Sequence, residues 1–181
     1  DRLGVDYLDM LYVHWPARAY DPEETLRAFD ELYDDGTIRN VGVSNFEPKH
    51  LDEAREMLDA PIFANQIEMH PFLKQEKLRA YADENDVELV AYSPLARGKV
   101  MDDPTLTDIA EKHDTSAAQV SLAWLREKGV TAIPKATSEA HIRDNWESLA
   151  LELNEEDVER IDGIERVDRQ VEPDFLTLPW N

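Results

Sequence analysis

Side chains that could take part in chemistry stand at the ends of five apolar runs of the sequence. They are His14 with Trp15, Ser44 with Asn45, Gln66, Tyr92 with Ser93, and Lys135. If the runs are parallel strands of an α/β fold, their carboxyl ends lie on one face, where such folds place functional residues. Because five separate coincidences are less frequent than one site, these residues predict a single binding or catalytic site.

Each of these residues also has a purely structural interpretation. Ser44 and Asn45 suit a strand-to-helix turn in which the asparagine caps the helix. His14 and Tyr92 suit packing in a core, and Lys135 suits a surface cation whose apolar stem lies against the protein. The site is therefore predicted by the whole set and not by any one member.

A metal centre is one chemistry that these residue types allow. Glu68 and His70 lie two apart on one side of an expected strand, and His14 could supply a third ligand, as in catalytic zinc sites. Pro71 follows immediately, however, and no second cluster of ligands supports the arrangement. We therefore expect no metal.

Nucleophilic catalysis and doubly wound nucleotide binding are also disfavoured. A nucleophilic Ser93 would need a turn of the Gly-x-Ser-x-Gly kind, but its neighbours are Tyr92 and Pro94. The six glycines form neither a Gly-x-Gly-x-x-Gly fingerprint nor a phosphate-binding loop. Neither class of site is therefore expected.

The elements that must position these residues alternate between strands and helices. Apolar runs predict strands at residues 7–13, 40–43, 62–67, 87–91 and 131–133. Helical periodicity and caps predict helices at residues 22–35, 47–58, 75–84, 103–112, 116–128, 137–146 and 154–164. The spacing of the strands is typical of βα units and predicts a parallel sheet with right-handed crossovers.

The expected fold class is therefore α/β, with residues 1–181 forming one domain. A closed (β/α)8 barrel typically has about 250 residues and rarely fewer than about 200. This chain has 181 residues and five expected strands. The residues alone leave two architectures open, a small open α/β sheet or part of a barrel.

The composition excludes several classes of partner. The chain has 40 Asp and Glu, 19 Lys and Arg, no cysteine and a formal net charge of −21. Repulsion argues against nucleic acid and membrane surfaces, and disulfides and cysteine metal sites are impossible. A hydrophobic content of 42% still allows a folded core. No targeting segment or membrane span is present, so we expect a soluble, cytoplasmic protein.

The acidic excess is explained most simply by adaptation to concentrated salt. Near 1 M salt the Debye length is about 3 Å, so the repulsion within such a chain is screened. An ordinary acidic cytosolic protein is the alternative interpretation. We therefore interpret the net charge as an adaptation to the solvent in which the protein works, and it says little about the ligand.

Five segments of the chain resemble the aldo-keto reductase family, in the family's order. They are DYLDMLYVHWP at 6–16, GTIRNVGVSNF at 36–46, NQIEMHP at 65–71, AYSPL at 91–95 and IPKAT at 133–137. The likeness is to reductases of the xylose, aldose and 2,5-diketo-gluconate type. The resemblance implies a (β/α)8 (TIM) barrel that reduces aldehydes and ketones with NADPH and uses no metal. It further implies a C-terminal portion of the barrel, strands 4–8 with their helices, without the first three βα units.

The resemblance assigns roles to the residues at the nicotinamide and substrate end. His14 corresponds to the histidine that orients the substrate carbonyl, and Trp15 corresponds to a wall of the substrate pocket. Positions that hold the nicotinamide, by hydrogen bonds or by stacking, correspond to Ser44, Asn45, Gln66 and Tyr92. Trp180, near the C-terminus, is a further candidate for the pocket wall.

At the other end of the cofactor, the resemblance implies a pyrophosphate site, a 2′-phosphate site and an adenine site. The corresponding residues are Ser93 and Leu95, then Lys135, Ala136 and His141, and finally Asp144 and Asn145. The family usually has serine at the position of Ala136 and arginine at that of His141. Because an imidazole binds phosphate less well than a guanidinium, NADH is an alternative to NADPH, although nearby Arg143 could restore the charge.

Three further catalytic residues of the family, a tyrosine, an aspartate and a lysine, have no counterpart in this sequence. Only His14 of the catalytic tetrad is present. One hypothesis is a fragment of an active, monomeric carbonyl reductase, inactive by itself. The other is a catalytically inactive dinucleotide-binding or regulatory module. We expect the first, because the family pattern begins abruptly at Asp1.

Overall fold

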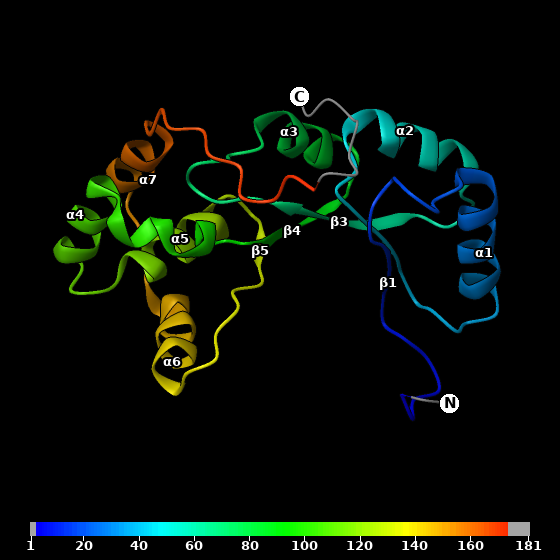
Figure 1. Cartoon of the computed structure of the whole chain (residues 1–181), viewed down its shortest axis with the longest axis horizontal. Coiled ribbons are helices and arrows are strands. Elements are labelled where there is room, and N and C mark those ends of the chain that lie inside the picture. The colour runs from blue at the N-terminus through cyan, green and yellow to red at the C-terminus, as the bar shows by residue number, and fades with distance from the viewer. Residues whose placement is uncertain (1–2, 174–181) are drawn as a thin grey trace. The chain divides into compact units, whose positions relative to one another are not determined.

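The computed structural model of the chain describes residues 3–173, in which strands and helices alternate (Figure 1). The strands are β1 (Leu11–Val13), β2 (Val41–Ser44), β3 (Ile62–Glu68), β4 (Glu88–Tyr92) and β5 (Thr131–Ala132). They form a sheet in chain order, and the pairs β1–β2, β2–β3 and β4–β5 are parallel. The expected α/β class, with a parallel sheet of five strands, is confirmed.

The helices follow the predicted positions. They are α1 (Pro22–Asp34), α2 (Pro48–Met57), α3 (Glu76–Glu84), α4 (Pro104–Lys112), α5 (Ala117–Glu127), α6 (Glu139–Glu147) and α7 (Glu155–Asp162). Asp21, Asp103 and Ser116 each accept a hydrogen bond from a backbone N–H of the first turn that follows. These caps satisfy donors that have no partner inside a helix, which is why the helices begin where the sequence indicates.

Some predicted boundaries were wrong. The strand expected at residues 7–13 is reduced to β1 and an isolated bridge between Leu8 and Ile38, because Tyr7, Asp9 and Met10 do not pair with a neighbouring strand. The helix expected from residue 137 begins at Glu139, because Ser138 is extended and its Oγ accepts the His141 N–H. Two short 3₁₀ helices, η1 (Ala96–Asp102) and η2 (Ser148–Ala150), were not predicted.

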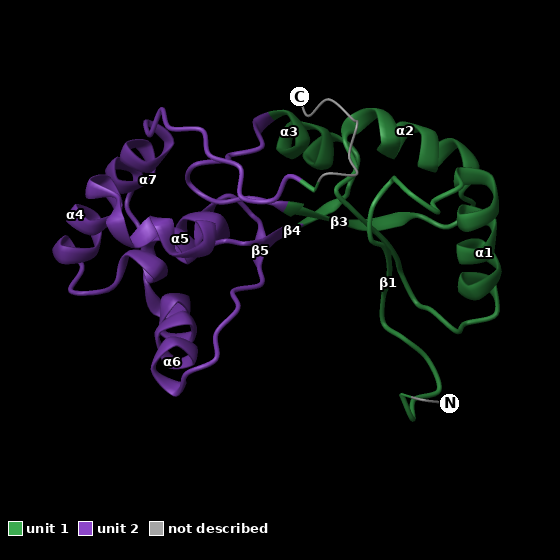
Figure 2. Ribbon diagram, viewed as in Figure 1, with its two compact units in different colours: residues 1–67, 77–89, 173–181 green, residues 68–76, 90–172 purple. Residues whose placement is uncertain are grey.

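The chain divides into two compact units (Figure 2). Unit 1 comprises residues 1–67, 77–89 and 173–181, and unit 2 comprises residues 68–76 and 90–172. Unit 1 carries β1, β2, nearly all of β3 and helices α1 to α3. Unit 2 carries the carboxyl end of β4, β5 and helices α4 to α7.

Each unit has a buried centre that fixes the loops next to it. In unit 1 all four residues of β2 are buried, as expected for a parallel strand covered on both faces. In unit 2 residues 117–125 of α5 are all buried, and the Ser121 hydroxyl donates to the Pro94 carbonyl at 2.8 Å. The turn after β4 is therefore anchored to the most buried helix of unit 2. Among the described residues, no helix is long and apolar enough to span a membrane.

Candidate functional site

Asn45 connects the ends of two strands in unit 1. It is buried and has a left-handed backbone, with φ of 63°, a conformation that asparagine tolerates better than most residues. Its side-chain amide donates to the His14 carbonyl at 3.2 Å and to Ser44 Oγ at 3.0 Å. The turn after β2 therefore holds the backbone that carries His14.

Ser44 and Gln66 extend this network to β3. The Ser44 hydroxyl and the Asn45 N–H both donate to the Gln66 carbonyl, at 2.8 and 2.9 Å. The Gln66 side chain bonds to Tyr12, and this bond opposes the burial that raises the pKa of the Tyr12 phenol. The Tyr12 ring lies over Gly42, where a Cβ would be only 2.6 Å from Cε1. Glycine at residue 42 thus permits this position of Tyr12.

His14 and Trp15 present side chains at the end of β1. The imidazole is exposed, and its ring centroid lies 6.1 Å from the indole centroid at an interplanar angle of 49°. An exposed imidazole beside an aromatic ring can hydrogen-bond a small polar molecule that packs on that ring. The structure therefore brings the predicted residues of unit 1 together, namely His14, Trp15, Ser44, Asn45 and Gln66.

A cavity of about 460 Å³ in unit 2 is lined by most of the residues predicted for the adenosine and phosphate end of a dinucleotide. They are Ser93, Leu95, Lys135, His141, Asp144 and Asn145. These six residues come from the turn after β4, the segment after β5, and α6. Residues predicted from three separate segments thus share one cavity.

The wall of this cavity is rich in basic groups, although the chain is strongly acidic. Lys135, His141 and Arg97 line it, and none of the three forms an ion pair in the part of the chain that the structure describes. Asp144 supplies the only carboxylate among the described lining residues. That carboxylate accepts hydrogen bonds from Ser116 and Gln119, at 2.8 and 2.7 Å. The cavity is therefore suited to an anion.

Tyr92, at the end of β4, is held as a neutral, half-buried phenol. Burial and the Glu68 charge raise its pKa, and the charges of Arg169 and Arg97 only partly oppose them. Its carbonyl accepts the Met69 N–H at 3.4 Å, within unit 2. The phenol is neutral near pH 7, as an unperturbed tyrosine also is, and the raised pKa keeps it neutral in more alkaline solution.

Glu68 and His70, considered above as metal ligands, bind each other and the backbone. His70 Nε2 lies 2.9 Å from Glu68 Oε1, and both side chains are fully buried. The Glu68 carboxylate also accepts the N–H groups of Gln170 and Val171, at 2.6 and 2.8 Å. Burial acts to raise the pKa of Glu68, but these hydrogen bonds lower it overall. No group of three potential metal ligands occurs within residues 3–173.

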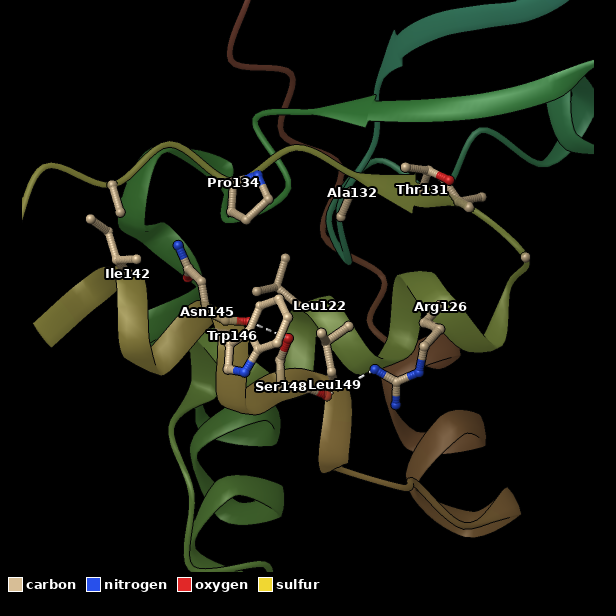
Figure 3. Close-up of a pocket in the computed structure, with 13 residues that line it drawn as sticks. Leu122, Arg126, Thr131, Ala132, Pro134, Ile142, Asn145, Trp146, Ser148 and Leu149 are labelled. Carbon is tan, nitrogen blue, oxygen red and sulfur yellow. Dashed lines mark hydrogen bonds between the residues drawn. The ribbon is translucent and has the colours of Figure 1, made fainter. Parts of the chain in front are cut away.

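A second cavity in unit 2, of about 670 Å³, was not predicted (Figure 3). Its wall is mostly apolar and includes Ile142, Trp146 and Leu149, which are 57%, 72% and 60% exposed. Ala136, predicted for the phosphate site, lines this cavity and not the smaller one, whereas Asn145 lines both. The spacing of these three apolar residues is typical of a helix face that packs against a core. The sequence pattern therefore predicts buried side chains, and it gave no sign that these three are exposed.

Arg143 does not have the position expected of a replacement for the missing arginine. Its guanidinium pairs with Glu139 at 3.2 Å on the exposed surface of α6, and it does not line the smaller cavity. The cation that sequence reasoning missed is Arg97. A single arginine in a turn has no periodic spacing that a sequence could reveal, and the turn that places Arg97 has positive φ values at Ala96 and Arg97. Trp180 lies outside the described residues.

Sequence comparison gives a consistent family. The profile of the Aldo/keto reductase family matches residues 1–166. Glyoxal reductase of Bacillus subtilis (strain 168) is 42% identical over 169 residues, which is 93% of this chain and 61% of that protein. An aldo-keto reductase of Mycobacterium sp. (strain JLS) is 40% identical over 174 residues, 93% of this chain and 62% of that protein. The chain spans about three-fifths of the length of these relatives.

Solved structures agree with the sequence comparison. A provisionally named 2,5-diketo-D-gluconic acid reductase B has a TM-score of 0.94 at 35% identity, over 99% of this chain and 65% of that one. MGS-M4, an aldo-keto reductase from a Medee basin deep-sea metagenome library, has a TM-score of 0.87 at 31% identity, over 98% and 67%. With the family profile covering most of its length, the chain belongs to the aldo/keto reductase family.

Proposed function

We propose that the protein reduces small aldehydes and ketones, keto sugars among them, to alcohols by hydride transfer from a nicotinamide dinucleotide. The observation that carries this proposal is the smaller cavity of unit 2, which is lined by six residues that the resemblance assigns to the dinucleotide. Family membership and the names of relatives, such as glyoxal reductase, support a small carbonyl substrate.

The adenosine end of the cofactor is assigned to this cavity. Lys135 and Arg97 supply positive charge, which suits phosphate groups, and His141 adds an imidazole N–H. Lys135 is assigned to the 2′-phosphate, and NADPH is therefore the proposed cofactor. NADH is the alternative, since His141 replaces the usual arginine and Arg143 lies outside the cavity.

The nicotinamide end is assigned, from the family resemblance, to residues at and after the ends of strands β2, β3 and β4. When bound, the dinucleotide supplies the hydride, and the protein's part is to position the reactants and to polarise the carbonyl. We assign the carboxamide to the hydrogen-bonded group of Ser44, Asn45 and Gln66. The family resemblance assigns the stacking face to Tyr92, whose neutral, half-buried ring is suited to it.

The substrate carbonyl is assigned to His14, with Trp15 as the adjoining wall. Asn45 holds the His14 backbone, so the imidazole starts from a fixed point while its ring remains exposed. An imidazole N–H aimed at the carbonyl oxygen would stabilise the negative charge that develops there during reduction. His14 is therefore proposed to orient and polarise the substrate.

The proposed architecture is a (β/α)8 barrel of which this chain forms strands 4–8. The chain order of the parallel strands and the greater length of the relatives support it. In that barrel the proton donor, a tyrosine with its aspartate and lysine, would come from the first three βα units. The 181-residue chain by itself would then bind dinucleotide without turnover, because loss of a general acid forfeits roughly 10²–10⁴-fold in rate.

A catalytically inactive dinucleotide-binding or regulatory module is the second candidate. It is favoured by a cavity that holds the predicted cofactor residues in a chain whose only recognised catalytic residue is His14. We propose that the protein works as a monomer in the cytoplasm of a salt-adapted cell. The charge of −21 supports the adaptation to salt.

Steady-state oxidation of NADPH and NADH by the complete gene product tests the proposal. The assay uses a panel of aldehydes, ketones and keto sugars, in dilute buffer and in molar salt. We expect turnover that depends on the carbonyl compound and on His14, with His14→Ala strongly impaired. Dinucleotide binding without turnover on any substrate would favour the module, and absence of binding would refute both candidates.

A further inference from the structure

Arg97 lines the smaller cavity of unit 2, although the family resemblance assigns it no role. Its neighbours in the wall include Ser93 and Leu95, which are assigned to the pyrophosphate of the dinucleotide, and Lys135, which is assigned to the 2′-phosphate. A guanidinium in this wall can bind two phosphate oxygens at once, which an ammonium cannot do with the same geometry. From this position Arg97 could bind either the pyrophosphate or the 2′-phosphate.

The backbone at Arg97 is held in a conformation that few residues adopt. Ser93, Ala96 and Arg97 have positive φ values of 49°, 46° and 52°, and Gly98 follows at 95°. The Ala96 and Gly98 N–H groups donate to the Ser93 and Leu95 carbonyls, each at 2.8 Å. Such strain persists only where the surroundings enforce it, and it is concentrated at functional sites.

The surroundings of this turn are rigid. Ala96 is completely buried, and Ser121 of the buried helix α5 donates to the Pro94 carbonyl at 2.8 Å. The turn that carries Arg97 is thus held by the packing of Ala96 and by the hydrogen bond to Pro94. An arginine on a fixed turn loses less conformational freedom on binding a ligand than one on a mobile loop.

The charge of Arg97 is not neutralised by a carboxylate. Nearby Lys99 is paired with Asp168, at 2.9 Å. Arg97 forms no ion pair within residues 3–173, in a chain with 40 acidic and 19 basic residues. A cation without a carboxylate partner on the wall of a cavity is a favourable site for an anionic ligand.

Arg97 also lies within electrostatic reach of Tyr92. The pKa of that phenol is raised by burial and by Glu68, and the charges of Arg169 and Arg97 act in the opposite direction. Tyr92 is assigned to the nicotinamide and Lys135 to the adenosine phosphate. In a dinucleotide, the pyrophosphate connects these two halves, so a cation near Tyr92 on the wall shared with Lys135 fits the bridge.

We propose that Arg97 binds the pyrophosphate of the dinucleotide and is the principal cation at that bridge. This inference rests on the proposed dinucleotide function and adds a residue to its site. It also gives a local reason why a chain of charge −21 can bind a polyanion. Arg97 would act on NADP⁺ and NAD⁺ alike, whereas Lys135 would act on NADP⁺ alone.

Calorimetric titration of the complete gene product with NADP⁺, NAD⁺ and inorganic pyrophosphate tests this proposal. We expect Arg97→Gln to weaken binding of all three by about ten-fold or more, the effect of one charge-assisted hydrogen-bonded contact. Arg97→Lys should recover part of the loss, and Lys135→Gln should weaken NADP⁺ only. Arg143→Gln is the matched control on the outer surface of α6, and it should leave all three affinities unchanged.

The outcomes separate this proposal from the proposed function. If Arg97→Gln weakens NADP⁺ alone, or weakens none of the three, the pyrophosphate assignment is wrong while the dinucleotide function stands. If the parent protein binds pyrophosphate through Arg97 but binds neither dinucleotide, the anion site is supported and the proposed function fails. If the parent binds none of the probes, both are overturned. Circular dichroism of each variant excludes misfolding as the cause of a loss.

Discussion

At the scale of single residues, Tyr92 offers a half-buried aromatic ring at the end of β4. Burial and the neighbouring Glu68 charge raise its pKa, so the phenol stays neutral even at alkaline pH, and we propose that its ring stacks on the nicotinamide. We expect Tyr92→Ala to weaken NADPH binding about 3- to 10-fold, which corresponds to one aromatic contact. Tyr92→Phe keeps the ring and should retain most of the affinity. Quenching of protein fluorescence by NADPH measures both variants, and an equal loss for Phe and Ala would contradict stacking.

Gly42 illustrates a residue whose smallness matters for a neighbour. A Cβ at residue 42 would lie 2.6 Å from the Tyr12 ring, so Gly42→Ala must displace the tyrosine that bonds to Gln66. We expect a loss of about 1–3 kcal/mol in the free energy of unfolding, as for other overpacked sites. Urea denaturation provides the measurement. In a Tyr12→Ala background the same change should cost much less, and an unchanged cost would show that the ring is not responsible.

At the scale of elements, a buried carboxylate joins α4 to α7. Asp157 is fully buried and receives hydrogen bonds from Lys112 Nζ and His113 Nε2, both at 2.7 Å. Removing one partner of such a group leaves the others without compensation. We expect Asp157→Asn to lower the free energy of unfolding by about 2 kcal/mol. This is less than for a fully buried ion pair, because the Lys112 side chain is partly exposed to water.

The same two helices provide a control. Asp108 and Arg160 also join α4 to α7, at 3.3 Å, but both side chains are exposed. Exposed pairs contribute little, so Asp108→Asn should cost less than about 1 kcal/mol in the same urea experiment. Equal costs for the buried and the exposed pair would contradict the role of burial.

The Asp157 contribution should also depend on pH, with a definite sign. Burial acts to raise the pKa of Asp157, but hydrogen bonds and charges from Lys112 and His113 lower it overall. Because the folded pKa is depressed, the stabilisation is fully present above the unfolded value, about 3.9, and is lost as pH falls through the folded value. Urea midpoints of the parent and of Asp157→Asn should therefore differ at neutral pH and converge in acid. A gap that grows below about pH 4 would reverse this sign.

Sequence predicted the elements better than the cavities they enclose. Prolines and caps such as Asp21 and Asp103 are local signals, and the helices begin as those residues indicate. Six of the predicted cofactor residues share a cavity because they stand at strand ends and on α6, where topology brings them together. Arg97 was missed because its position depends on a strained turn. Ala136 lines the larger cavity and not the one shared by the six, a difference that residue spacing does not indicate.

At the scale of the whole molecule, net charge sets the conditions for stability. A charge of −21 on 181 residues repels itself in dilute buffer, and salt screens that repulsion. We expect the urea midpoint to rise steadily as NaCl increases from about 0.1 M to about 2 M, a range in which the Debye length falls below about 3 Å. Sucrose at equal concentration is the control, since it favours burial without screening. Equal effects of salt and sucrose would argue against charge repulsion as the cause.

The central claim, hydride transfer from a nicotinamide to a carbonyl carbon, is tested most directly by isotope transfer. The complete gene product is incubated in molar salt with NADPH carrying deuterium at the transferable C4 position and with an aldehyde that it reduces. Mass spectrometry of the alcohol should find one deuterium per molecule on the former carbonyl carbon. An alcohol without deuterium, or a protein that produces no alcohol from any carbonyl compound, would contradict the account.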